Sequence, residues 1–132
     1  ILAGDQMTSD KTCLLLYRQY AEARAKCRCE VCGAPEGDPH HIYTRENKAV
    51  RYDAEYNAIW LCNPHHRLAE ELGTKDLIRF LVNTGIRPKE WEKELIRRKN
   101  QIVKCNDQYR EDWKQKLLKQ LEVYRGQKIS GK

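Results

Sequence analysis

The stretch that decides the fold begins with Cys29-Glu-Val-Cys32, passes through His40-His41-Ile42 and Asn57, and ends with Leu61-Cys62-Asn-Pro-His65-His66. It gathers seven Cys and His side chains from a chain of 132 residues that holds 6 Cys and 4 His. Pairs of ligands separated by two residues can grip one tetrahedral zinc ion from a tight turn. The spacing therefore predicts a structural zinc site made by Cys29, Cys32, Cys62 and His65.

Two neighbouring residues leave alternatives open in this assignment. Cys27 lies two positions before Cys29 and is an alternative first ligand, although it lacks the two-residue spacing of a zinc knuckle. His66 follows His65 directly, and only the register relative to Cys62 favours His65 as the zinc ligand. His66, His40 and His41 are then outside the zinc site and are candidates for a different function.

Composition indicates one small α+β domain, which we expect to span residues 7–132. Charged residues make up 33% of the chain and the mean hydropathy is -0.86, so burial of apolar surface is limited. A structural metal ion would compensate as a cross-link.

No stretch approaches the roughly 18 apolar residues of a membrane span, and no signal-peptide pattern precedes Met7. We expect a soluble, cytoplasmic protein without a membrane partner, with a viral origin as one alternative.

Helix-capping residues, the positions of Gly and Pro, and the hydrophobic periodicity predict the order of the elements. Ser9-Asp10 is good N-cap chemistry for an amphipathic helix over residues 9–27. Two short β-prone runs follow, at residues 40–44 and 57–62. Asn63-Pro64 then predicts a helix with Asn63 as N-cap and its stop at Gly73, after which Thr74 can cap a further helix.

The C-terminal region, residues 88–125, lacks Gly and has no Pro after Pro88. Apolar residues recur there at helical spacings from Trp91 through Ile102 to Tyr124, which predicts a helical stripe. The pattern fits one long helix, which we favour, or a helical hairpin broken near Asn106-Asp107. The stripe could pack on the chain's own core or on a homodimer or partner protein.

The excess of basic over acidic residues lies in the C-terminal third of the chain. Residues 87–132 hold 14 of the 25 Lys and Arg residues but only 7 of the 19 Asp and Glu residues. Such asymmetry favours a polyanionic partner bound through phosphates, although a solvated helix face is the alternative. The candidate residues for DNA binding are Arg97, Arg98, Lys99, Lys104, Arg110 and Lys114.

Taken together, the Cys pairs, His40-His41-Ile42, Asn57 and Cys62-Asn-Pro-His65-His66 resemble the HNH endonucleases that contain a zinc knuckle. The resemblance covers residues 29 to about 72. It implies a small ββα-metal core with structural zinc, predicted over residues 29–84. This core would be flanked by the N-terminal helix and the long basic C-terminal helical region.

The resemblance also implies roles for individual residues. His41 matches the general base, for which imidazole is suited at neutral pH. His40 and His66 match the ligands of a catalytic divalent cation, which could be Mg, Mn, Ni or Zn. Asn57 matches the residue that ties down the loop between the strands, and Glu70, one helical turn after His66, is a candidate third ligand.

These roles predict a metal-dependent DNA endonuclease. His41 would deprotonate the attacking water, and the products implied by the resemblance carry a 5′-phosphate and a 3′-hydroxyl. The alternative is a zinc-stabilised nucleic-acid-binding accessory protein without catalysis. A redox protein using Cys29 and Cys32 is less favoured, because Gly33 and Pro35 do not supply the strand–helix context of that motif.

Overall fold

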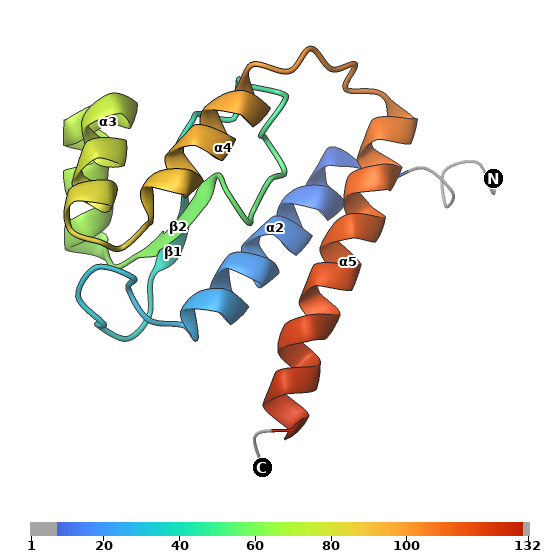
Figure 1. Cartoon of the computed structure of the whole chain (residues 1–132). Coiled ribbons are helices and arrows are strands. Elements are labelled where there is room, and N and C mark those ends of the chain that lie inside the picture. Colours follow the sequence, from blue (N-terminus) through green and yellow to red (C-terminus); the bar gives the residue numbers. More distant parts are fainter. Residues whose placement is uncertain (1–7, 131–132) are drawn as a thin grey trace.

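The computed structural model describes residues 8–130, with side chains as far as Tyr124. The predicted domain limits at residues 7 and 132 lie outside this range. Within it, the elements are α2 (Asp10–Ala25), β1 (Asp38–His41), β2 (Ala58–Leu61), α3 (Asn63–Asn83), α4 (Lys89–Lys99) and α5 (Asp107–Ser130). The predicted α+β class is confirmed (Figure 1). None of the described helices is long and apolar enough to cross a membrane.

Helix α2 begins and ends where its sequence directs. The Ser9 hydroxyl accepts a hydrogen bond from the Thr12 N–H at 3.0 Å, and Lys26 closes the helix in a left-handed conformation with φ of 55°. This agrees with the prediction of a helix over residues 9–27. Its buried face carries Tyr17 and Tyr20 toward the sheet and α5.

The two strands form one antiparallel ladder in which His40 pairs with Ile59 and His41 with Ala58. The first strand starts and ends earlier than the predicted run at residues 40–44. The reason lies at Tyr43, whose backbone N–H donates to Asn57 Oδ1 and whose carbonyl accepts from Asn57 Nδ2. A side chain therefore takes up the backbone groups that a longer ladder would have paired.

Helix α3 begins as Pro64 predicts, but Cys62 rather than Asn63 holds the N-cap position. Gly73 interrupts the helix with φ of 80°, and a further helical segment follows at once. Thr74 donates its hydroxyl hydrogen to the Ile42 carbonyl at 2.8 Å. The kink therefore anchors α3 to the end of β1.

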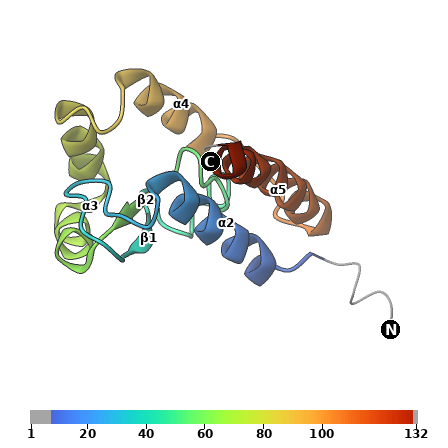
Figure 2. The same cartoon turned by 90° about the horizontal axis from the view of Figure 1, so that it is seen from below.

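The prediction of one continuous C-terminal helix is wrong. Helix α4 ends at Lys99, and the Asn106 side chain accepts a hydrogen bond from the Tyr109 N–H at 2.9 Å, which starts α5 at Asp107. The break lies where the alternative placed it. Over the described residues, however, α4 and α5 do not form a hairpin: α4 packs against α3, and α5 runs along α2 (Figures 1 and 2).

The apolar stripe divides between two clusters of the chain's own core. Trp91 and Leu95 of α4 join α3 and one face of β2, whereas Leu117 and Leu121 of α5 join α2 and the opposite face. Ile102, which the sequence places in the stripe, does not pack on the core: it lies in the segment between the helices and is fully exposed. The described part of the stripe therefore covers the core on both sides of the sheet.

Candidate metal centre and histidine site

Three segments bring the Cys and His side chains of the first group together. Cys29 and Cys32 lie on a turn after α2, closed by a hydrogen bond from the Gly33 N–H to the Cys29 carbonyl at 2.8 Å. Cys62 is the N-cap of α3 and His65 lies in its first turn. The sequence spacing works because each pair occupies one turn of backbone.

The four ligand atoms lie close enough together to surround one metal ion. All lie within 4.8 Å of one another. Cys32 Sγ is 3.7 Å from Cys62 Sγ, and His65 Nδ1 is 3.7 Å from Cys29 Sγ and 3.3 Å from Cys62 Sγ. Tetrahedral zinc, with bonds of about 2.3 Å to sulfur and about 2.0 Å to nitrogen, places such ligand atoms roughly 3.5–3.8 Å apart. The group can therefore hold a metal ion such as zinc.

The surroundings of Cys29 favour its thiolate form. Burial raises the pKa of this thiol, but hydrogen bonds from the backbone of Cys62, Cys32 and Val31 outweigh burial, and the pKa falls to about 6. A thiolate is the form that binds zinc. Cys27 is exposed and is not part of the group, so the structure selects Cys29 as the first ligand.

A second, smaller group joins β1 to α3. His40 Nδ1 lies 3.3 Å from His66 Nε2, with the two rings nearly perpendicular at 84°. Two nitrogen ligands of one cation have about this separation. His65 and His66 thus face different groups, as their register relative to Cys62 predicts. Glu70 Oε2 is 4.0 Å from His66 Nε2 on a side chain that is 65% exposed, so Glu70 lies at the open side of the pair.

His41, the last residue of β1, packs against α2. Its ring stacks on Tyr17 of α2 at 4.2 Å with planes 5° apart, and its Nε2 lies 2.9 Å from the Arg51 carbonyl. Burial lowers the pKa of His41 to about 4; the Arg51 carbonyl opposes this effect, and the charges of Arg45 and Arg51 add to it. The ring is therefore neutral at neutral pH, with Nε2–H donating to the carbonyl and the lone pair on Nδ1.

Asn57 is fully buried and ties the loop between the strands together. Besides its two bonds to the Tyr43 backbone, its Nδ2 donates to the Val50 carbonyl at 3.1 Å. Its own carbonyl accepts from the Tyr17 hydroxyl at 2.7 Å. Asn57 does not touch His41 directly; it shares with it the support of Tyr17.

Two supports of the site carry no signal in the sequence. Tyr17 reads there as one more apolar residue of α2, and nothing in its spacing indicates the contact with His41. Glu30, inside the first Cys pair, is the second: its carboxylate binds Arg24 at 3.1 Å and Arg87 at 2.9 Å, and accepts from the Trp60 N–H. Burial opposes the charge of Glu30, but the two arginines outweigh it and lower its pKa. Glu30 thereby ties the Cys turn to α2, β2 and the turn before α4.

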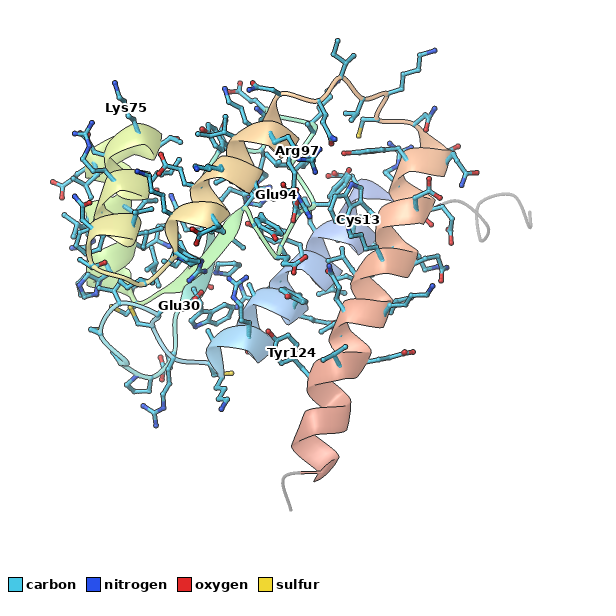
Figure 3. The ribbon with its side chains drawn as sticks, in the orientation of Figure 1. Cys13, Glu30, Lys75, Glu94, Arg97 and Tyr124 are labelled. Carbon is cyan, nitrogen blue, oxygen red and sulfur yellow. The ribbon has the colours of Figure 1, made fainter. Side chains whose placement is uncertain are left out.

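The six residues predicted to bind DNA fall into two classes. Arg97 pairs with Glu94 on α4 (Figure 3), Arg98 with buried Asp53, and Arg110 with Asp107. The other three, Lys99, Lys104 and Lys114, form no ion pair among the described residues, although the charge of Lys114 adds to hydrogen bonds from Thr8 and Gln115 in lowering the pKa of Glu111. Arg98 therefore joins α4 to the loop between the strands, whereas Arg97 and Arg110 pair only within their own helices.

Comparisons with protein-family models, with curated proteins and with solved structures find no match. The function therefore has to follow from the chemistry of the site.

Proposed function

We propose that the protein is a metal-dependent DNA endonuclease of the HNH type. Three features support the proposal: the order of the motif residues in the chain, their placement on an antiparallel strand pair followed by a helix, and the separate grouping of the two sets of ligands. The Cys29, Cys32, Cys62 and His65 group would hold a structural zinc ion. The remaining histidines would carry the chemistry.

One observation carries the proposal most strongly. His40 and His66, brought together from a strand and a helix, form a two-nitrogen pair at 3.3 Å, and His41 adjoins it in the chain with one ring nitrogen fixed by the Arg51 carbonyl. A structural zinc site closes its ligand sphere with four protein groups, whereas a catalytic site leaves positions for water and substrate. The histidine pair is of this open type.

In the proposed reaction His41 acts as general base. Its Nε2–H is directed to the Arg51 carbonyl, so Nδ1 is the atom that accepts a proton from the attacking water. Stacking on Tyr17 fixes the plane of the ring. A divalent cation held by His40 and His66 would neutralise charge on the phosphate oxygens. Asn57 acts as a positioning residue, because it fixes the loop that carries the Arg51 carbonyl.

The experiment that tests this function is cleavage of supercoiled plasmid by zinc-loaded protein with added Mg²⁺, Mn²⁺, Ni²⁺ or Zn²⁺. His41→Ala should lower the rate by about 10²–10⁴-fold while the zinc content stays as in the wild type. Because the change also removes the stack on Tyr17 and the donor to the Arg51 carbonyl, its melting temperature should fall, and cleavage is compared well below that temperature. Tyr43→Phe is the matched control, since it alters a nearby ring that no proposed step uses. Cleavage by His41→Ala at the wild-type rate would remove His41 as the base.

A second candidate is a zinc-stabilised nucleic-acid-binding protein without catalysis. It is favoured by the cations that lack acidic partners among the described residues, which would bind a polyanion whether or not it is cut. The two candidates differ in one result. Binding of plasmid without cleavage under every cation would select the binding protein.

A further inference from the structure

The loop between the strands, residues 42–57, carries or adjoins four cations that form no ion pair among the described residues. Arg45 and Lys48 are exposed loop residues, Lys99 ends α4, and Lys104 lies in the segment between α4 and α5. Among the described residues, none of the four has an acidic partner within ion-pair distance. By contrast, Arg51 of the same loop is held by Asp10 at 2.7 Å.

Side-chain contacts bring these segments to one place. Lys99 Nζ lies 5.1 Å from the centre of the Tyr43 ring. The Tyr109 hydroxyl donates to the Lys48 carbonyl at 3.0 Å, and the Tyr52 hydroxyl is 3.8 Å from Cys105 Sγ. The end of α4, the following segment and the start of α5 therefore all meet the loop. Figure 1 shows this loop and the α4–α5 segment on the same side of the molecule.

The same loop leads directly from the histidine site. It follows β1, whose last residue is His41, and the Arg45 carbonyl accepts a hydrogen bond from Arg51 Nη1 at 2.9 Å. The Arg51 carbonyl in turn lies 2.9 Å from His41 Nε2, so Arg51 joins the stretch that carries Arg45 to His41. The loop that carries two of the four cations is therefore joined to His41 through Arg51.

We propose that Arg45, Lys48, Lys99 and Lys104 form one surface, the loop surface, that binds the sugar–phosphate backbone of DNA. An unpaired cation gives up only water and counterions when it meets a phosphate, whereas a paired arginine must also leave its carboxylate. The DNA contacts proposed here therefore lie on the loop and the adjoining lysines, and they exclude the paired arginines of α4 and α5 that the sequence suggested. Only its link to cleavage at His41 rests on the proposed function; the binding itself does not.

The test measures the affinity of zinc-loaded protein for a short DNA duplex over a series of salt concentrations. A His41→Ala background keeps the duplex intact. The loop variant Arg45→Gln/Lys48→Gln should bind at least about 10-fold more weakly at moderate salt. Its slope of log affinity against log salt should fall by about two, because each of the two removed cations would neutralise one phosphate.

The matched control is Lys116→Gln/Lys119→Gln on α5, which removes the same charge from exposed positions away from the loop. It should keep the slope of the parent protein, and both variants should unfold at the parent temperature. Equal weakening in the two variants, or none in the loop variant, would overturn the loop surface. Weakening confined to the loop variant, together with no plasmid cleavage by the protein that retains His41 under any added cation, would sustain the loop surface and overturn the endonuclease.

Discussion

Two groups of Cys and His side chains lie near each other, one completed by His65 and the other by His66, and they differ in how many ligand atoms they bring together. The Cys29, Cys32, Cys62 and His65 group supplies four ligand atoms within 4.8 Å of one another. The His40–His66 pair supplies two, with Glu70 at its open side. A closed ligand set stabilises a fold, whereas an open one leaves room for water and substrate. The number of ligand atoms brought together, more than residue type, therefore separates the two proposed roles.

The largest effect is expected when a ligand of the Cys29, Cys32, Cys62 and His65 group is removed. Cys62→Ala should release the metal and abolish cooperative unfolding, because metal binding at such a site is folding free energy. The check is metal analysis together with a thermal melt. Cys27→Ala is the control, since Cys27 lies outside the group; retained metal in Cys62→Ala would show that the group is not the metal site.

Adjacent histidines provide the next test. His65→Ala should lose the structural metal and much of the stability, whereas His66→Ala should keep both and lose cleavage by at least about 10²-fold. The two changes are chemically identical and one residue apart. Zinc content, melting temperature and plasmid cleavage, measured on both variants, would contradict the division if the effects were shared or reversed.

Asn57→Ala tests the support of the loop between the strands. It removes the partners of the Tyr43 N–H and of two carbonyls inside the fold, which should cost about 2–4 kcal/mol in the free energy of unfolding. The metal of the closed group should stay bound. Urea denaturation measures the loss, and exposed Asn100→Ala serves as the control; a loss no larger than that of Asn100→Ala would contradict the role.

The smallest effect concerns Asp10, which fixes the loop from α2. Its hydrogen bond with Arg51 outweighs burial and holds its pKa at about 2, below the ordinary 3.8. Because the folded-state pKa is lowered, its contribution to stability is present above about pH 4 and is lost as the pH falls toward 2. Asp10→Asn should flatten the stability profile in that window only. Melting curves from about pH 2 to 6 measure it, and an unchanged profile would assign the acid sensitivity to other carboxyl groups.

The closed group was predictable because its information is local. Each ligand pair lies within four consecutive residues, so a tight turn brings both side chains to one point whatever the rest of the chain does. The start of α3 was predictable for the same reason, since Pro64 acts on its own backbone. The division between His65 and His66 also followed from register alone.

Other features depended on partners distant in the chain. The end of β1 was set by Asn57, fourteen positions after Tyr43, and the support of His41 by Tyr17 of α2. The paired state of Arg98 depends on Asp53, forty-five positions earlier. Such contacts have no spacing rule, because the fold alone brings the partners together.

The sequence by itself therefore determined which side chains can hold metal, where the first two helices begin, and that the C-terminal region is basic and helical. Only the tertiary structure decided that this region is two helices on opposite sides of the sheet, that Arg97, Arg98 and Arg110 pair with carboxylates, and that the end of α4 and the segment after it meet the loop between the strands. The physical reason is the distance along the chain over which each kind of interaction acts. Turn geometry and capping act over a few residues, whereas packing and ion pairing depend on where the whole chain places its segments.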